Sequence, residues 1–175
     1  MTTIRRIRAD EWEKVRMLRL AALADPAAPI AFLETLEEAL ERPAEFWESR
    51  AAGAATGPTA QFVAEAPSGE WLGTVVVLVF EAGTEDYWGH PVPGRRANVV
   101  GVFVKPEARG AGLIDQLMAA AKEYAVSEGF DELRLEVHRT NHRARAAYER
   151  AGFVATGDVI ESACGTDAVM VASLR

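Results

Sequence analysis

The spacing of apolar residues along this chain alternates between the two-residue repeat of strands and the three-to-four-residue repeat of helices. Apolar or alternating runs predict strands over residues 3–8, 61–66, 71–80, 99–104, 154–160 and 168–174, with a further strand beginning at residue 133. Helical spacing predicts four helices: residues 10–23 with Asp10 as N-cap, 34–52 with a break near Pro43, one opening after Gly112 and one following Asn141. This order predicts a single α/β (α+β) domain.

Residues 99–114 read VVGVFVKPEARGAGLI and form the most informative segment. A run of β-forming residues stops at Pro106, and a glycine-bearing turn then leads into a helix. The first amides of a helix lack intrahelical acceptors and carry the positive end of its dipole, so such a turn can bind a pyrophosphate. Ordinary strand-to-helix packing has the same pattern, so this segment alone leaves both interpretations open. The helix is indicated by apolar positions at Leu113, Ile114, Leu117, Met118, Ala121, Tyr124 and Ala125.

A second segment, residues 133–153, reads LRLEVHRTNHRARAAYERAGF and combines a strand, Asn141, a short helix and a Gly-Phe exit. The two segments together resemble the GCN5-related N-acetyltransferase (GNAT) superfamily. RGAGLI is similar to its pyrophosphate motif R/Q-x-x-G-x-G/A, with Arg109 and Gly112 in register and Ile114 where a small residue is usual. The second segment is similar to the cofactor motif of ribosomal-protein N-terminal acetyltransferases in particular. The resemblance is specific over residues 98–153.

This resemblance implies one GNAT domain over residues 1–175, with a mixed, mostly antiparallel sheet of about seven strands flanked by about four helices. It also implies acetyl-CoA as acyl donor, direct transfer to an amine, and no metal. Family members pair the fourth strand with the pantetheine arm through main-chain groups, one of which faces the thioester carbonyl. Carried over by position, the cofactor-binding residues are Val102, Phe103, Val104, Arg109, Gly110, Ala111, Gly112, Leu113, Ile114, Asn141 and Tyr148.

Two side chains are candidates for the chemistry. Tyr148 stands where many family members carry the general acid, and a tyrosine hydroxyl, with a pKa of about 10, is protonated at neutral pH. Tyr148 also follows Ala144 on an apolar helix face, so core packing is an alternative. Glu136 is the candidate base, expected among apolar neighbours because it alternates with Leu135 and Val137. A solvent-facing or salt-bridged glutamate, with water as the base, is the other interpretation.

The acceptor site is expected in the irregular segments outside the cofactor motifs. Residues 81–97 form a polar stretch broken by Gly and Pro, and a solvated hairpin is its alternative interpretation. Phe32, Tyr87 and Trp88 are the predicted substrate-binding residues. Glu85 and Asp86 beside them would attract a cationic amine.

Composition narrows the function classes. The net charge of −7 argues against a nucleic-acid partner, because binding phosphate backbones needs a basic face. The single cysteine, Cys164, excludes an internal disulfide, and its setting gives it no base that would make it a nucleophile. The N-terminus has no signal-like apolar segment, and the longest apolar run, residues 75–80, cannot cross a membrane. We therefore expect a cytoplasmic enzyme, a monomer or homodimer, with no membrane partner.

Three functional hypotheses follow. The first is an acetyl-CoA-dependent N-acetyltransferase acting on a primary amine of a small molecule. The second is a protein N-terminal or lysine acetyltransferase, which would share the cofactor site. The third is a non-catalytic acyl-CoA-binding module, which would need neither Tyr148 nor Glu136. His138 and His142 straddle a strand end and a helix start without a third ligand nearby in the sequence, so metal binding is not expected.

Overall fold

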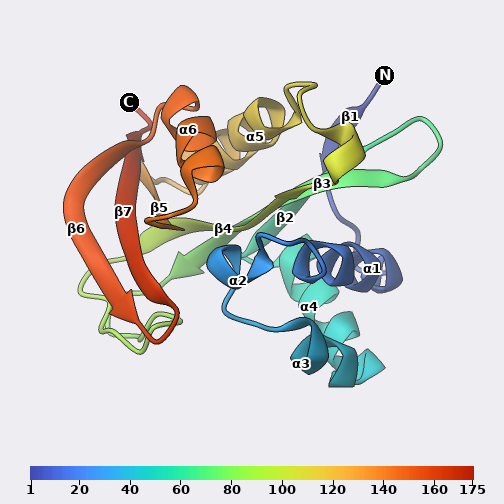
Figure 1. Cartoon of the computed structure of the whole chain (residues 1–175), viewed down its shortest axis with the longest axis horizontal. Helices are drawn as coiled ribbons and strands as arrows, with labels where there is room; N and C mark the ends of the chain where they lie inside the picture. The colour runs from blue at the N-terminus through green and yellow to red at the C-terminus, as the bar shows by residue number, and fades with distance from the viewer.

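The computed structural model describes all 175 residues and shows one sheet of seven strands in the order β1-β2-β3-β4-β5-β7-β6 (Figure 1). All neighbouring strands pair antiparallel except β4 and β5, which are parallel. The mixed, mostly antiparallel sheet predicted from the sequence is confirmed. The strands are β1 (Thr3–Arg6), β2 (Ala60–Glu65), β3 (Trp71–Phe80), β4 (Arg96–Val104), β5 (Glu132–His138), β6 (Val154–Ser162) and β7 (Gly165–Ser173).

Six α-helices, rather than the expected four or so, accompany the sheet: α1 (Trp12–Leu23), α2 (Ala28–Ala31), α3 (Leu36–Glu41), α4 (Ala44–Thr56), α5 (Leu113–Ser127) and α6 (His142–Arg150). Pro43 divides the expected helix 34–52 into α3 and α4 and acts as the N-cap of α4. The short α2 has Pro29 in its first turn, where a proline costs no hydrogen bond. Glu11, not Asp10, is the N-cap residue of α1, and it provides no side-chain cap.

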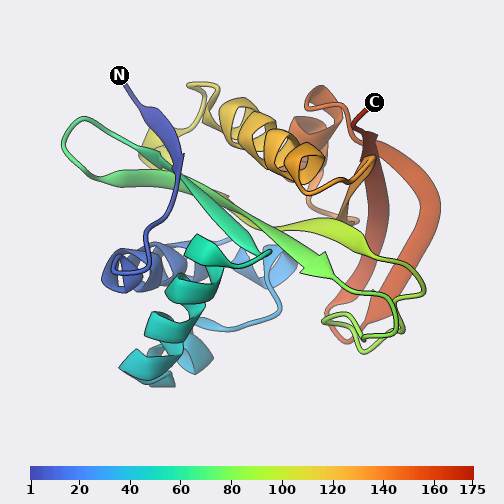
Figure 2. The same cartoon turned by 180° about the vertical axis from the view of Figure 1, so that it is seen from behind.

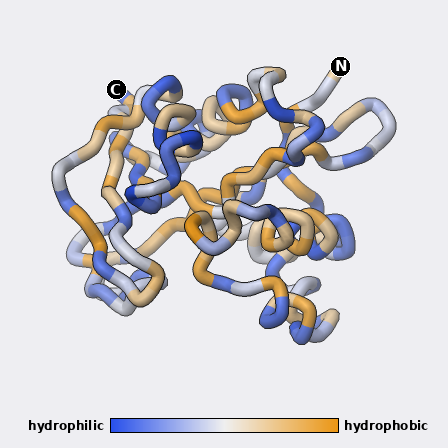
Figure 3. Tube along the Cα trace, in the orientation of Figure 1, coloured by the Kyte–Doolittle hydropathy of each residue, from blue (hydrophilic) through white to orange (hydrophobic).

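The two faces of the sheet carry two separate hydrophobic cores. On one face, α5 packs against the central strands through Leu117, Met118 and Ala121. On the other face, α1 and α4 pack against the sheet, with Trp47 completely buried between them. Figures 1 and 2 show α5 and α6 on one side of the sheet and α1–α4 on the other. In Figure 3 the hydrophobic colour follows the central strands, as expected where both faces are covered.

Strands β4 and β5 separate immediately after they meet, and this separation creates the site. Their only paired residues are Asn98 and Arg134. Within β4, Gly101 and Val102 together stand opposite Val75 of β3, which makes a β-bulge with Gly101 at φ +61°. Beyond Asn98, the edge of β4 that faces β5 has no strand partner.

Close packing of β3 against β4 and α5 depends on Gly73. A Cβ atom there would lie 2.9 Å from the Phe103 carbonyl oxygen and 3.0 Å from Val104 Cγ2. We predict that Gly73→Ala lowers the free energy of unfolding by about 1–3 kcal/mol, the cost of overpacking a filled core. Gly53→Ala is the control, because a Cβ in α4 meets nothing within 4 Å. This control should instead add about 0.5–1 kcal/mol. Urea unfolding of both variants measures the difference, and a Gly73→Ala protein as stable as the parent would contradict the packing.

Candidate active site

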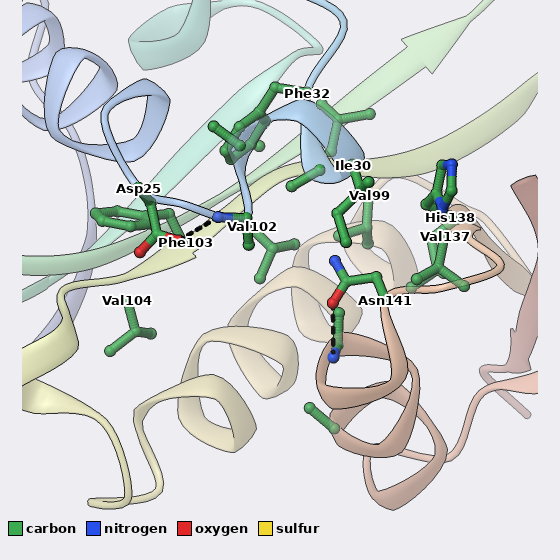
Figure 4. A pocket seen from close by; sticks show the side chains of 18 of the residues that line it. Asp25, Ile30, Phe32, Val99, Val102, Phe103, Val104, Val137, His138 and Asn141 are labelled. Carbon is green, nitrogen blue, oxygen red and sulfur yellow. Dashed lines mark hydrogen bonds between the residues drawn. The ribbon is translucent and has the colours of Figure 1, made fainter. Parts of the chain in front are cut away.

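A single cleft of about 920 Å³ runs between the two layers of helices, along the diverging strands β4 and β5. It is lined by all the residues predicted for cofactor, substrate and catalysis except Ala111, which lies outside its wall. Figure 4 shows Ile30 and Phe32, from α2 and its C-terminal end, across the cleft from Asn141 at the start of α6, with the β4 side chains between them. The residues predicted from separate parts of the sequence therefore share one cavity.

The cleft wall formed by β4 is largely a wall of main chain. Because β5 pairs only at Asn98, the peptide groups from Val99 onward on this edge have no strand partner. Phe103 and Val104 are buried and their side chains belong to the two cores, one on each face. An extended ligand lying here would be bound as an added strand by backbone donors and acceptors.

The turn before α5 has the geometry of an anion-binding loop. Gly110 and Gly112 both have positive φ, at +82° and +75°, and Gly112 is the N-cap of α5. The first hydrogen bond into the helix runs from the Gln116 N–H to the Gly112 carbonyl at 3.2 Å. The amides of residues 113–115 are therefore free at the positive end of a 15-residue helix.

Arg109, expected in the pyrophosphate motif, is occupied with the protein itself. Its Nη2 atom lies 2.6 Å from Oδ2 of Asp25 and its Nε donates to the Val104 carbonyl at 3.0 Å. Burial opposes ionisation of Asp25, but hydrogen bonds from Ala27 N–H and Arg109 outweigh it and hold the pKa of Asp25 below its usual value. Arg109 thus fastens the loop to the end of α1, which leaves anion binding to the main chain.

Tyr148 lies on α6 and faces the cleft. Burial alone raises its pKa to about 12, with no hydrogen bond or charge contributing. Its ring packs edge-on against Phe153, with centroids 6.3 Å apart. Asn141 caps the same helix, accepting a hydrogen bond from Ala144 N–H at 3.3 Å. Tyr148 therefore presents a protonated hydroxyl on a helix whose start is fixed by Asn141.

Glu136 also lines the cleft, but its neighbours are polar rather than the apolar ones expected. Its side chain is 3% exposed and lies 3.1 Å from Nε of Arg134. The Asn98 side-chain amide donates to both carboxylate oxygens, at 3.3 and 3.2 Å, and the Tyr87 hydroxyl donates to Oε2. This buried carboxylate is thus held in place from three directions.

The segment between β3 and β4 is a structured hairpin extension. Asp86 organises it: its carboxylate accepts hydrogen bonds from the backbone of Trp88 and His90 and pairs with Arg96 at 2.7 Å. Asp86 is buried and away from the cleft, so the expected attraction of a cationic amine by this carboxylate is wrong. Tyr87 and Trp88 do line the cleft, with ring centroids 5.6 Å apart. Burial, followed by the negative charge of Glu136, raises the pKa of Tyr87, so its hydroxyl stays protonated and donates to Glu136.

Several residues at this site were missed in the sequence. Asn98 interrupts an otherwise apolar strand where asparagine is disfavoured, and Arg134 stands two residues before Glu136 on the same strand face. Either fact could have indicated a polar cluster. Asp167 lines the cleft from β7, opposite His138 of β5, and burial raises its pKa. Asp25 gave no local signal, because its partner is 84 residues away.

Comparison with known proteins agrees with this geometry. A sequence profile of the Acetyltransferase (GNAT) family matches residues 17–153. An aminoglycoside N(6′)-acetyltransferase type 1 from Klebsiella aerogenes is 30% identical over 125 residues, which is 71% of this chain and 76% of that protein. The chain belongs to the GNAT family. It is therefore an N-acetyltransferase by family.

Solved GNAT structures share the whole fold. The PaiA N-acetyltransferase of Thermoplasma acidophilum, solved in complex with coenzyme A, has a TM-score of 0.73 at 19% identity, covering 99% of each chain. A chimera of the Vibrio cholerae spermidine N-acetyltransferase SpeG with hSSAT has a TM-score of 0.70 at 19% identity, covering 99% of this chain and 95% of that one. At these identities the likeness concerns the fold. In this GNAT chain, no helix is long and apolar enough to cross a membrane, and no three potential metal ligands gather together.

Proposed function

We propose that this GNAT protein transfers the acetyl group of acetyl-CoA directly to the primary amine of a small molecule. The observation that carries the proposal is the continuity of the cleft. One cavity joins the free amides at the start of α5, the unpaired edge of β4, Tyr148 and Glu136. A pyrophosphate fits the main-chain donors at Gly112, and a pantetheine arm fits the gap between β4 and β5. The coenzyme A complex of the similar Thermoplasma protein supports this assignment.

When bound, acetyl-CoA supplies an activated acetyl thioester. Residues 102–104 hold it by main-chain hydrogen bonds, and an amide of β4 directed at the thioester carbonyl lowers the barrier by a few kcal/mol, on the order of an oxyanion-hole donor. Tyr148, protonated in the cleft, donates its proton to the departing sulfur. Glu136 accepts the proton of the incoming amine, directly or through a water, with Asn98 and Arg134 fixing its position.

Phe32, Tyr87 and Trp88 form the proposed acceptor wall. All three line the cleft, from segments outside the two cofactor motifs. The names of the aminoglycoside and spermidine acetyltransferases describe small amine acceptors and support a small acceptor here. The resemblance of the second cofactor segment to ribosomal-protein N-terminal acetyltransferases favours the second candidate, transfer to a protein N-terminus or lysine. A peptide beginning with a free amine, compared with free amines, separates the two.

The pyrophosphate assignment predicts the effect of changing Gly112. Gly112→Val places a β-branched residue at φ +75° and should weaken acetyl-CoA binding by about 10-fold or more, because the loop must reshape. Gly129→Val is the matched control: it bears similar strain at φ +85°, outside the cleft. Thermal unfolding with and without acetyl-CoA measures binding as a ligand-dependent rise in Tm. Equal rises in Tm with acetyl-CoA in both variants would contradict the assignment of the pyrophosphate to this loop.

The proposed role of Tyr148 as general acid predicts that Tyr148→Phe loses turnover and retains its affinity for acetyl-CoA. This change removes only the hydroxyl, so kcat should fall by about 10²-fold or more while the KM for acetyl-CoA stays within about twofold. Tyr124→Phe is the control, since that hydroxyl bonds the Pro58 carbonyl outside the cleft and should leave kcat unchanged. Because burial raises the pKa of Tyr148 to about 12, the parent should show no alkaline loss of kcat from this group below about pH 11. Unchanged turnover in Tyr148→Phe would favour proton donation by water, whereas binding of acetyl-CoA without turnover in either protein would favour an acyl-CoA-binding module.

The acceptor wall predicts different effects on the two substrates. Trp88→Ala removes an indole from the cleft and should raise the KM for the acceptor by about 10-fold, with little change in the KM for acetyl-CoA. Trp12→Ala, at the start of α1 and outside the cleft, is the control for general loss of packing. Steady-state kinetics varying each substrate in turn gives both constants. Equal changes in both KM values would make residues 81–97 a purely structural hairpin.

A further inference from the structure

Three arginines gather where the helices α1–α4 line the cleft. Arg19 comes from α1, Arg42 follows α3, and Arg50 comes from α4. These helices cover the face of the sheet opposite α5 and α6, which carry the pyrophosphate loop and Tyr148 (Figure 1). The arginines therefore border the part of the cleft left for the acceptor in the proposed reaction.

Two of these arginines share one carboxylate. Glu34 accepts from Arg19 Nε through Oε2 at 3.1 Å and from Arg42 Nε through Oε1 at 2.9 Å. Both guanidinium groups also lie over aromatic rings, Arg19 at 4.7 Å from the Phe32 centroid and Arg42 at 4.3 Å from that of Phe46. Each oxygen of Glu34 thus accepts a hydrogen bond from one of these two arginines, and neither oxygen is hydrogen-bonded to Arg50.

Arg50 has no comparable partner. No protein acceptor bonds its guanidinium, which lies 5.8 Å from the centre of the Trp47 ring. Burial and the positive charge of Arg19 outweigh the negative charge of Glu34 and lower the pKa of Arg50 to about 10, which leaves it cationic at neutral pH. The cleft thus contains a half-buried, unpaired cation beside a cluster whose charges already sum to positive.

An unpaired cation in a cleft favours ligands that bring the missing anion. A guanidinium offers a planar fork of donors that matches a carboxylate or phosphoryl group in two parallel hydrogen bonds. The same charge repels a polycation, because bringing like charges together in a partly desolvated site is costly. The acidic residue once expected to attract cations, Asp86, is instead paired with Arg96.

We propose that the acceptor of this enzyme is an amine that also bears an oxyanion, a carboxylate or a phosphoryl group, and that Arg50 binds this oxyanion. The inference rests on the proposed function and names its substrate class. In the reaction, the acetyl C–S bond breaks and a C–N bond forms, the amine loses one proton, and the CoA sulfur gains one. The oxyanion takes no part in this exchange; it positions the amine. This acceptor class differs from the polycations in the names of the aminoglycoside and spermidine enzymes.

Matched acceptors test the proposal directly. Release of free CoA thiol is followed with 4-aminobutyrate against butylamine, phenylalanine against phenethylamine, and 2-aminoethylphosphonate against ethylamine, with spermidine as the polycation. We expect at least one oxyanion-bearing acceptor to exceed its uncharged partner by about 10-fold or more in kcat/KM. The carboxylate and phosphonate arms show which oxyanion is preferred.

Variants connect the preference to Arg50. Arg50→Met keeps an aliphatic side chain without the charge and should raise the KM of the best oxyanion-bearing acceptor by about 10-fold, with the KM for acetyl-CoA unchanged. Arg50→Lys keeps the charge without the planar fork of donors, and its KM for this acceptor should lie between those of the parent and of Arg50→Met. Arg16→Met removes the same charge from α1 outside the cleft and should behave as the parent. The uncharged partner amines should be little affected by any of these changes.

The outcomes separate this inference from the proposed function. Turnover of plain amines or spermidine as good as that of every oxyanion-bearing acceptor would overturn the inference and leave acetyl transfer standing. An Arg50→Met enzyme that retains the full preference would also overturn it. Binding of acetyl-CoA with no turnover of any oxyanion-bearing acceptor counts against the inference as well. A protein that shows no rise in Tm with acetyl-CoA and acetylates nothing would instead overturn the proposed function.

Discussion

The separation of β4 from β5 is the constraint on which the rest of the site depends. A parallel pair of strands would ordinarily satisfy its backbone groups along its length, but here the pairing ends at Asn98 and Arg134. The open edge of β4 leaves backbone groups available to water or to a ligand in the cleft. The bulge at Gly101 and Val102 lies on this same strand, after Val99 and Val100. The open wall of the cleft is therefore a direct product of the sheet architecture.

The polar cluster around Glu136 forms at the point where the two strands part. Asn98 belongs to the single β4–β5 pair and is fully buried, and its amide reaches the carboxylate on the neighbouring strand. Arg134 is its pairing partner and approaches the same carboxylate. Tyr87 completes the cluster from the hairpin extension that Asp86 holds together. A buried carboxylate with this many donors has a fixed position, which a proton acceptor requires.

Elements formed by contiguous residues were predicted from the sequence, whereas contacts between segments far apart in the chain were missed. Strand β3 has the predicted bounds, because its apolar run ends at clear turn signals, and the glycine loop before α5 is contiguous in the chain. The short α2 was not predicted, although a proline such as Pro29 in a first turn is compatible with a helix. The apolar surroundings predicted for Glu136 were wrong because Asn98 and Tyr87 reach it from two other segments, and alternation along one strand says nothing of its neighbours. Arg134 lies on the same strand and could have been noticed. Arg50 carries no periodic signal at all, since only folding brings it beside Arg19 and Glu34.

The ion pair between Asp25 and Arg109 joins two parts of the cleft that are far apart in the sequence. Asp25 follows the last turn of α1, directly before the segment that carries Phe32, while Arg109 opens the loop before α5. The glycine loop before α5 and the segment that carries Phe32 are thus connected through one short, largely buried contact. Any ligand that shifts this contact at one end changes the free energy of binding at the other, and by linkage the effect is equal in both directions. In the proposed reaction, this contact would couple the binding of the two substrates without touching either reacting atom.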